Sequence, residues 1–290
     1  MSTNTSRISP TAHYTAYVWF RNGMSHDALA TPLGRAFFHA FEPFNLAVSH
    51  ISGGLTLERM LLQRHRVIDH LLHEAIGSGQ IGQLLEVASG LSPRGYRFAE
   101  RYPELQVVEG DLPEMAATKE RLLKANGLLR PNHRIVPVNV LLDEGPRSLA
   151  SLVGTVLDPE RRTAVITEGL PGYFDYRVVA EIWRRLAAMI RDTAGGRYYA
   201  DLHVNAELED LWIARAFMRA LHFVTRGERT EPFSTAIEAS RALENAGFDR
   251  ATLHRPKAFH TRVEVPVLQR PDVIRVVEAE IRAGDGTPRS

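Results

Sequence analysis

Five short apolar segments separated by helical patterns constrain the fold of this chain more than any other feature. Strands that alternate with helices form a parallel sheet, because a helical crossover is needed to join parallel strands. Continuously apolar strands are typical of a sheet that is covered on both faces. The sequence therefore predicts an α/β fold with a mostly parallel sheet between two layers of helices. The predicted strands are Leu84 to Val87, Leu105 to Val108, Ile135 to Val138, Ala164 to Thr167 and Arg197 to Asp201.

Amphipathic segments fill the gaps between the predicted strands. Apolar residues recur at helical spacing from Leu57 to Ala75, and Gly77 is placed to end that helix. We expect two domains, an N-terminal helical lid or cap over residues 1–56 and a catalytic domain over residues 57–290. The other predicted helices are Tyr96 to Tyr102, Glu114 to Asn126, Val178 to Ile190 and Ala236 to Ala246. A closing β pair is predicted at Thr252 to Leu253 and Val263 to Leu268.

The composition argues against several classes of function. Lys and Arg total 35 against 34 Asp and Glu, so no basic surplus favours a nucleic-acid or membrane partner. The chain has no cysteine, which excludes disulfides, thiolate metal sites and a cysteine nucleophile. We expect neither a secretion signal nor a membrane-spanning helix, because the N-terminal residues lack an apolar run and no later stretch approaches about 18 uninterrupted apolar residues. We expect a cytoplasmic protein that acts on a small molecule, and the sequence leaves its oligomeric state open.

The turn after the first predicted strand indicates a nucleotide-type ligand. In an open α/β sheet this turn meets the ligand, and an acid about 20 residues later accepts hydrogen bonds from ribose hydroxyls. Glu109 stands at that interval from the first strand. Of the three slots that hold glycine in a dinucleotide fingerprint, Ala88, Gly90 and Ser92, only the middle one is glycine. A pyrophosphate would therefore fit poorly, which favours a ligand without phosphate such as S-adenosylmethionine.

Three motifs in a fixed order resemble the leucine carboxyl methyltransferase and polyketide O-methyltransferase family, and a fourth, late motif resembles one that recurs widely in class I methyltransferases. They span roughly residues 60 to 270, and their order is more specific than any single motif. The resemblance implies a Rossmann-like class I methyltransferase fold that binds S-adenosylmethionine without a metal. The motifs are Glu86-Val-Ala-Ser-Gly-Leu-Ser-Pro-Arg94, Glu109-Gly-Asp-Leu-Pro113 with Lys119, Glu168-Gly-Leu170 with Tyr173, and Leu243-Glu-Asn-Ala-Gly-Phe248.

The resemblance leaves three functions open. Within the family the chain is most similar to the azetidine-2-carboxylate synthases, and the segment from Ile8 to Phe20 adds to that similarity. This branch implies cyclisation of S-adenosylmethionine by attack of its α-amino group on Cγ, giving azetidine-2-carboxylic acid and 5′-methylthioadenosine. The family as a whole equally implies an O-methyltransferase acting on a carboxylate or hydroxyl of a small natural product. The missing glycines and Asn139 also allow a non-catalytic binding protein on this scaffold.

The first strand and its turn supply the candidate contacts to the ligand's methionyl end. Glu86 could order the turn or hold the amino group, although a buried arginine could also pair with it. Ala88 and Gly90 bring the backbone close to the ligand, and a plain tight turn is the alternative for Gly90. Arg94 matches the family's arginine after the turn, and such an arginine can donate two parallel hydrogen bonds to the ligand's carboxylate. The alternative is a surface arginine that caps its own helix. Arg66 is expected to compete for that carboxylate.

The next three strands supply candidates for the rest of the ligand. Glu109 ends its strand at the distance of about 20 residues from the first strand that is typical of an acid binding ribose, and we expect it to be exposed there. Asn139 stands where the resemblance implies an acid that contacts adenine, so that contact is in question. Glu168 lies at the carboxyl end of the fourth strand, next to the reacting carbon in this architecture.

The candidate catalytic residues follow the fourth and fifth strands. Tyr173 and Tyr176 can turn aromatic faces toward a sulfonium, since a cation over a π ring is stabilised when water is excluded. Ordinary packing is an equal alternative for Tyr173. Asn205 could hold a neutral amine with its amide oxygen, whereas a solvated loop is the alternative. The segment from Asp201 to His203 is the other polar group there.

The N-terminal aromatic residues predict a lid. Tyr14, Tyr17 and Phe20 share one helix face, and with Trp19 they could cover the ligand and exclude water. Plain packing is the alternative for such an aromatic stripe.

The histidines of the chain show no metal-binding spacing. No His-x-x-x-His pair or pair of acids has the geometry that a metal needs. His65 and His70 share a helix with basic residues, and we expect both to be solvated. We predict no metal.

Overall fold

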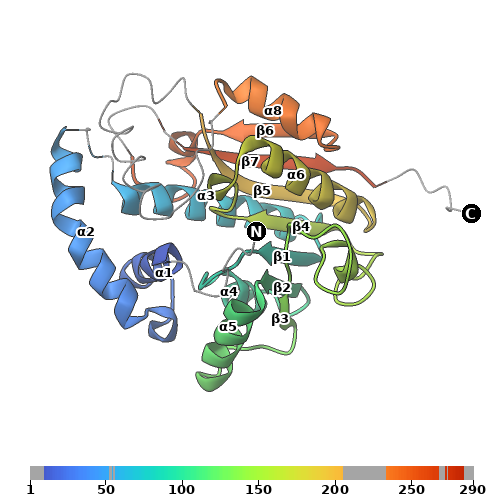
Figure 1. Ribbon diagram of the computed structural model, residues 1–290, viewed down its shortest axis with the longest axis horizontal. Coiled ribbons are helices and arrows are strands. Elements are labelled where there is room, and N and C mark those ends of the chain that lie inside the picture. The colour runs from blue at the N-terminus through green and yellow to red at the C-terminus, as the bar shows by residue number, and fades with distance from the viewer. Residues whose placement is uncertain are drawn as a thin grey trace, which may run out of the picture.

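The computed structural model describes residues 10–51, 54, 56–204, 233–267, 272 and 274–283. Within these residues one seven-stranded sheet runs in the order β3-β2-β1-β4-β5-β7-β6 (Figure 1). The first five strands are parallel, and β7 is antiparallel to both β5 and β6. The strands are β1 Gln83–Val87, β2 Gln106–Asp111, β3 His133–Pro137, β4 Thr163–Thr167, β5 Gly196–His203, β6 Arg250–His254 and β7 Ile274–Ile281.

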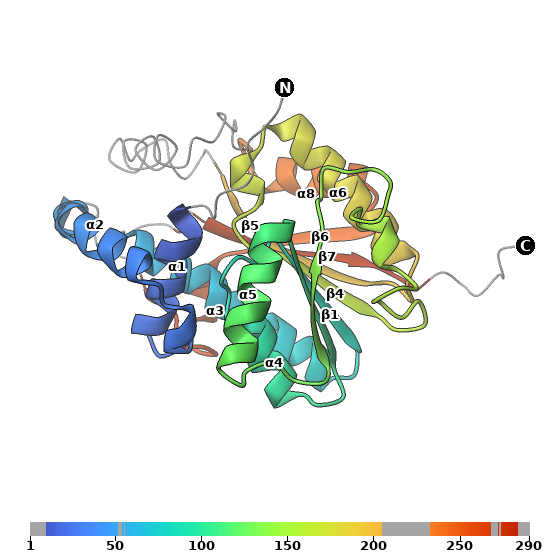
Figure 2. The same cartoon turned by 60° about the horizontal axis from the view of Figure 1, so that its bottom comes forward.

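Helices cover both faces of the sheet, which confirms the predicted α/β class (Figure 2). On one face Ile68 of α3 and Phe98 of α4 pack against the strands. On the other face Trp183 of α6 and Leu243 of α8 share a core with the strands. The helices are α1 Pro10–Arg21, α2 Pro32–Ile51, α3 Leu57–Gly77, α4 Arg94–Arg101, α5 Pro113–Ala125, α6 Tyr176–Arg191 and α8 Ala236–Asn245.

Local sequence explains where α3 and α6 begin. Thr56 caps α3 by accepting a hydrogen bond from the Arg59 amide at 3.1 Å. Asp175 caps α6 in the same way, accepting from the Val178 amide at 3.0 Å. Such caps satisfy amides that have no partner within the first turn of a helix. Tyr176 is therefore fixed in the first turn of α6, which follows the loop after β4.

The predicted strand at residues 263–268 is wrong. Residues 263–267 form no strand, and β7, at Ile274–Ile281, takes that place in the sheet. Because β7 lies between β5 and β6, it must pair on both edges, and a proline cannot donate to such a ladder. Pro266 interrupts the earlier segment, and its carbonyl accepts a hydrogen bond from the Gln63 side chain at 2.7 Å.

The order of the strands reverses between β1 and β4, so the switch point of the sheet lies at the carboxyl ends of these two strands. The chain leaves β1 toward β2 and β3 on one side and returns to β4 on the other. In open α/β sheets ligands bind at such a switch point, because the loops diverge there.

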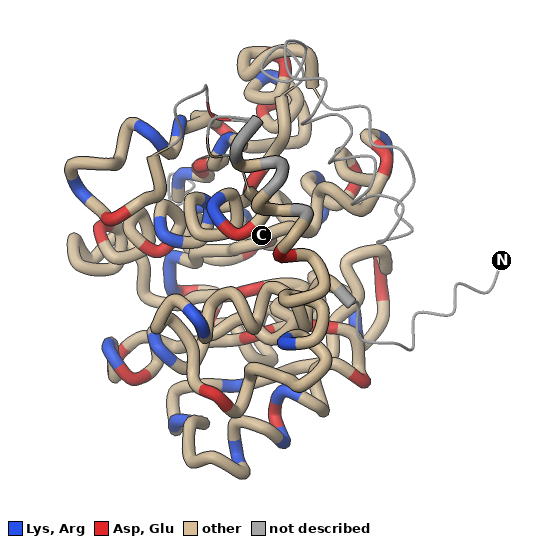
Figure 3. Tube along the Cα trace, turned by 90° about the vertical axis from the view of Figure 1, so that its left-hand side faces the viewer, with Lys and Arg blue, Asp and Glu red and all other residues tan. Residues whose placement is uncertain are grey.

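The N-terminal helices α1 and α2 lie beside this end of the sheet (Figure 1). They meet closely at Gly34, where an added Cβ would overlap the carbonyl oxygen of His13. The predicted domain boundary at residues 56 and 57 falls between α2 and α3 and stays a prediction. No helix in the described ranges is both long and apolar enough to cross a membrane. Acidic and basic residues are interspersed over the side shown in Figure 3.

Candidate functional site

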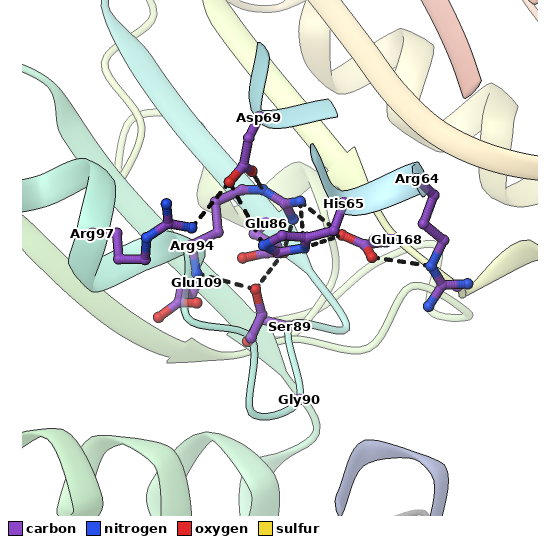
Figure 4. Close-up of polar contacts among 12 residues, drawn as sticks. Arg64, His65, Asp69, Glu86, Ser89, Gly90, Arg94, Arg97, Glu109 and Glu168 are labelled. Atoms are coloured by element: carbon purple, nitrogen blue, oxygen red, sulfur yellow. Dashed lines mark hydrogen bonds and ion pairs between the residues drawn. The ribbon is translucent and has the colours of Figure 1, made fainter. Parts of the chain in front are cut away.

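A fully buried arginine lies at the centre of the site, at the start of α4. The Arg94 side chain is 0% exposed, and its guanidinium bonds three carboxylates (Figure 4). Its Nε donates to Asp69 Oδ1 at 2.7 Å and its Nη2 to Glu168 Oε2 at 2.7 Å. Its Nη1 donates to Glu86 Oε1. Arg94 thus joins α3, α4 and the carboxyl ends of β1 and β4 through charge-assisted bonds.

A second arginine extends these contacts to β5. Arg64 Nε donates to Glu168 Oε1 at 3.0 Å, and Arg64 Nη1 donates to Asp201 Oδ2 at 2.8 Å. Asp201 also accepts from the Gly169 amide at 2.6 Å, which fixes the loop after β4. His65 Nδ1 lies 2.8 Å from Glu168 Oε2. We call the whole group the Arg94 cluster; its members are Arg64, His65, Asp69, Glu86, Arg94, Glu168 and Asp201.

The carboxylates of the Arg94 cluster differ in their affinity for protons. Burial opposes ionisation of Glu168, but the charges of His65 and Arg94 prevail and hold its pKa well below the ordinary value. Burial likewise opposes ionisation of Asp69, and its cationic neighbours lower its pKa. For Glu86 burial prevails over Arg94 and raises the pKa to about 7.

The turn from Ala88 to Ser92, which we call the ligand turn, contains two residues with left-handed backbone. Ala88 has a φ of 53° and Gly90 a φ of 49°, both in the left-handed region. Asp111, at the end of β2, accepts from the Gly90 amide at 2.7 Å with Oδ2 and from the Leu112 amide at 2.7 Å with Oδ1. Burial raises the pKa of Asp111, although the hydrogen bonds from these two amides act to lower it. An acid therefore lies directly beside the ligand turn.

Glu109 is buried, so the expectation of an exposed acid at this position, available to the ribose hydroxyls, is wrong. Its side chain is 0% exposed and is bonded by Lys119 Nζ at 2.5 Å and His133 Nε2 at 2.8 Å. Burial opposes ionisation, but Lys119 and His133 hold the pKa of Glu109 down at about 2. A Cβ on Gly95 would overlap the Glu109 carboxylate, so that group occupies the space beside α4. Of the two acids in this motif, Asp111 is the one beside the ligand turn.

Three buried polar atoms around the ligand turn have no hydrogen-bond partner within the described residues. They are Glu86 Oε2, Ser89 Oγ and Trp19 Nε1. An unsatisfied buried polar group costs about 1 to 3 kcal/mol, so three of them around one turn favour a polar ligand there. A carboxylate oxygen, a hydroxyl and an indole N–H suit the mixed donors and acceptors of S-adenosylmethionine. The residues therefore fit this ligand.

Helix α1 covers the ligand turn, but with a different face from the one predicted. Ala12 lies 3.5 Å from the position of a Cβ on Gly90. Trp19 is 5% exposed, and its ring centroid lies 4.9 Å from that of His65. Thr11 hydrogen-bonds to the hydroxyl of Tyr173, in the loop after β4. The small residues and Trp19 of α1 therefore face the site.

Tyr14, Tyr17 and Phe20 do not face the ligand turn. The rings of Tyr14 and Tyr17 lie 5.8 and 5.3 Å from that of Phe38 in α2, and Phe20 packs on Tyr17 at 6.1 Å. The expectation that this stripe covers the ligand is therefore wrong, and packing against α2 is its observed role. The period of a helix identifies an apolar face but not the neighbour that it meets.

The remaining predicted residues lie around the site or outside it. Tyr176 is 46% exposed, and its ring contacts Phe233 edge-on at 5.4 Å. Asn139 follows β3, and its side chain accepts from the Leu141 amide at 3.0 Å. Asn205 lies outside the described residues. The structure therefore leaves the catalytic roles of these residues as predictions.

Arg66 is turned away from the Arg94 cluster. Its Nη1 donates to the Glu264 carbonyl at 2.6 Å, so the expectation that it competes for a ligand carboxylate is wrong. Arg64, two residues earlier, occupies the site instead, because a helix turns by about 200° over two residues.

Sequence reasoning missed the part of the site that α3 supplies. His65 is 0% exposed, and the His70 ring lies against Phe259 at 5.7 Å, so the expectation of solvated histidines is wrong. His65 and Asp69 stand at i and i+4 within the apolar stripe of α3. Polar residues on a buried stripe require partners, and that position was the signal that could have revealed them.

Ala88 provides a test of the ligand turn. It is the only described residue other than glycine with a positive φ, and Ala88→Gly should remove strain of about 1 to 2 kcal/mol. We expect the urea midpoint of this variant to stay level or rise. Ala99→Gly is the matched control, because Ala99 lies buried within α4, where glycine should cost about 1 kcal/mol. A lower midpoint for Ala88→Gly than for Ala99→Gly would contradict the assigned turn.

The strand order and the site at the β1 and β4 switch point define a protein of the class I methyltransferase fold. A profile of the leucine carboxyl methyltransferase family matches residues 21–187, more than half of the chain. The chain belongs to that family of S-adenosylmethionine-dependent methyltransferases. No curated protein matches it in sequence.

Solved structures share the fold at low sequence identity. A putative methyltransferase from Thermobifida fusca YX is 18% identical, with a TM-score of 0.62 over 97% of each chain. A DUF574 family protein from Streptomyces avermitilis MA-4680 is 15% identical, with a TM-score of 0.60 over 95% of this chain and 98% of that one. PigF with SAH is 14% identical, with a TM-score of 0.51 over 86% of this chain and 70% of that one. At these identities the likeness concerns the fold alone.

Within the described ranges no group of three or more His, Asp or Glu side chains is arranged to hold a metal ion.

Proposed function

We propose that this protein binds S-adenosylmethionine at the carboxyl ends of β1, β2 and β4 and transfers its methyl group to an oxygen of a small molecule. The observation that carries the proposal is the position of Asp111 in a member of this family. Its carboxylate accepts a hydrogen bond from the Gly90 amide, in a turn where Ala88 and Gly90 have left-handed backbone. A carboxylate at the end of the second strand is suited to bind two ribose hydroxyls. The acceptor class is a carboxylate or a hydroxyl, in keeping with the family's description.

Arg64 is the better partner for the ligand's carboxylate than Arg94. All three guanidinium nitrogens of Arg94 already donate to carboxylates. Arg64 donates through Nε and Nη1, and its Nη2 lies beside Gly169, 3.1 Å from the position of a Cβ there. Arg94 then acts as a positioning residue that holds Glu86 and Glu168. We propose that these two carboxylates stabilise the α-ammonium group of the ligand.

The protein's contribution to methyl transfer is orientation and exclusion of water. The bound sulfonium supplies the reactive methyl group. Trp19 and Ala12 of α1 cover the ligand turn, and this cover lowers the local dielectric around the reacting groups. Tyr173 and Tyr176 follow β4, and Tyr173 is hydrogen-bonded to Thr11 of α1. We propose that their rings border the path of the acceptor.

Cyclisation of S-adenosylmethionine is the second candidate, and the cover formed by α1 favours it. Pro10–Arg21 carries Arg21 as its only formal charge at neutral pH, and α1 is tied to the loop after β4 through Thr11 and Tyr173. An enclosed site suits an intramolecular reaction, because no second substrate has to enter. The α-amino nitrogen would bond to Cγ while the bond from Cγ to sulfur breaks, and the amine would lose a proton to solvent. We propose Tyr176 and Asn205 as partners of the sulfonium and the amine in this case.

Incubation of the purified protein with S-adenosylmethionine distinguishes these functions. Methyl transfer predicts S-adenosylhomocysteine only when a carboxylate or hydroxyl acceptor is added. Cyclisation predicts methylthioadenosine and a cyclic amino acid from S-adenosylmethionine alone. Tight binding with neither product would point to a non-catalytic binding protein. Absence of binding would overturn the proposal as a whole.

Asp111→Asn tests the ribose contact. Hydrogen bonds to a charged group contribute about 1.5 to 3 kcal/mol, so we expect Kd for S-adenosylmethionine to rise about 10- to 150-fold. Isothermal titration calorimetry measures the change. The matched control is Asp143→Asn, whose side chain is 78% exposed and bonded to Arg185. Equal affinities for the two variants would remove Asp111 from the site.

A further inference from the structure

A second pocket, which shares no residue with the Arg94 cluster, lies between α3 and the last strands of the sheet. Its volume is about 390 Å³, within the range of about 300 to 1,000 Å³ that is usual for small-molecule sites. It is lined by α3, β5, β6, β7 and the short 3₁₀ helix η5, Pro256–Phe259, with the residues just after it. We call it the η5 pocket; its polar and aromatic lining consists of Glu74, Arg197, His254, Phe259, Arg262 and Glu278.

Three of these side chains already satisfy one another. Arg197 Nη1 donates to Glu278 Oε1 at 2.6 Å, and His254 Nε2 lies 2.8 Å from Glu278 Oε2. Arg197 Nη2 donates to the Gln80 side chain. Because both oxygens of Glu278 are engaged, this part of the lining is a fixed wall and leaves no carboxylate oxygen free for a ligand.

Phe259 gives the η5 pocket an apolar surface. Its ring meets the rings of His254 and His70 edge-on, with centroids 5.5 and 5.7 Å apart, and the residue is 6% exposed. Leu71 of α3 and Ala258 of η5 also line the pocket. An apolar group that entered would be removed from water against these side chains, which is favourable.

Two side chains of opposite charge remain available in the lining. In the part of the chain that the structure describes, no hydrogen bond or ion pair engages the Arg262 guanidinium. The Glu74 carboxylate, 56% exposed, has only His70 Nε2 as an ion-pair partner there, at 3.4 Å. The two groups come from different elements and do not pair with each other. A guanidinium is suited to bind a carboxylate, and a carboxylate is suited to bind an ammonium.

We propose that the η5 pocket binds an α-amino acid with an apolar side chain. Arg262 binds its carboxylate, Glu74 binds its ammonium, and the apolar lining around Phe259 takes its side chain. The lining holds two guanidiniums and two carboxylates, so a neutral zwitterion leaves both available charges paired. A simple anion or a simple cation would leave one of them without a partner. The inference is independent of the proposed function, because the η5 pocket and the Arg94 cluster share no residue.

Three probes that differ only in their charges test the proposal by calorimetric titration at millimolar concentration. They are L-phenylalanine, hydrocinnamate, which lacks the ammonium, and phenethylamine, which lacks the carboxylate. We expect phenylalanine to bind more tightly than either of the others. Saturation with S-adenosylmethionine should leave its affinity unchanged. Competition between the two would place phenylalanine outside the η5 pocket and overturn the inference, as would equal affinities for the three probes or no binding of any.

Variants at the surface assign the two contacts without disturbing the core. Arg262→Gln should raise Kd for phenylalanine about fivefold, the upper value for a partly exposed ion pair, and leave Kd for phenethylamine unchanged. Glu74→Gln should raise Kd for phenylalanine similarly and leave Kd for hydrocinnamate unchanged. Lys257→Gln is the matched control, because Lys257 is an exposed cation of η5 that does not line the pocket. Equal losses for Lys257→Gln and Arg262→Gln would overturn the assigned contact, since net charge alone would then explain binding.

Discussion

Replacing Arg94 with methionine is expected to lower the free energy of unfolding by about 3 to 5 kcal/mol, the cost of breaking a buried ion pair from one side. The variant would leave Asp69, Glu86 and Glu168 without the guanidinium that bonds all three. Asp69 lies on α3, Glu86 on β1 and Glu168 directly after β4, so we expect the whole fold to lose stability when these three places lose their common partner. Urea unfolding followed by circular dichroism measures the change.

Arg97→Met is the matched control for Arg94→Met. Arg97 bonds the same Asp69 at 3.1 Å, but its side chain is 35% exposed, and such pairs contribute about 0 to 1 kcal/mol. We expect its unfolding midpoint to stay close to that of the native protein. Similar losses for both variants would show that Arg94 is not the organising cation of the site.

Glu109→Leu is expected to lower the free energy of unfolding by about 3 to 5 kcal/mol, because Lys119 would be left buried without its carboxylate. The double variant Glu109→Leu, Lys119→Met should recover part of that loss, since apolar residues can replace a buried pair as a unit. Urea unfolding of the single and double variants measures the coupling. A single variant with native stability and a raised Kd for S-adenosylmethionine would instead support the ribose contact first predicted for Glu109.

Acid should weaken the same pair. The pKa of Glu109 in the folded protein is about 2, below the ordinary value of 4.5. The pair therefore stabilises the fold fully above pH 4.5, and that contribution is lost as the pH falls toward 2. The midpoint difference between the native protein and the double variant should shrink over this range. A difference that is constant with pH would contradict the ionised pair.

The sequence predicted those features that depend on local periodicity. The five parallel strands and the helices between them follow from apolar runs and amphipathic stripes, and the ligand turn follows from its place after the first strand. The strand predicted at Val263 to Leu268 is wrong within the described residues 263–267, because Pro266 cannot donate a hydrogen bond to a neighbouring strand. Pairing on two edges, which only the assembled sheet imposes, selected Ile274–Ile281 instead.

Within the site, the sequence identified acids and bases but not their partners. Glu86, Arg94 and Glu168 were expected to contact a ligand, and the structure brings them first to one another. Glu109 and Asp111 lie two residues apart in one motif, and nothing local distinguishes them. Lys119 and His133, from a later helix and strand, bond Glu109 and leave Asp111 beside the Gly90 amide.

The sequence by itself determined the fold class, the position of the ligand turn and the family to which the chain belongs. Only the tertiary structure decided that His65 and Asp69 of α3 complete the Arg94 cluster and that Trp19, not the Tyr14 face, covers it. The physical reason is that hydrophobic periodicity is a property of neighbouring residues. The pairing of buried charges depends instead on which distant side chains the packed sheet and helices bring within hydrogen-bond distance.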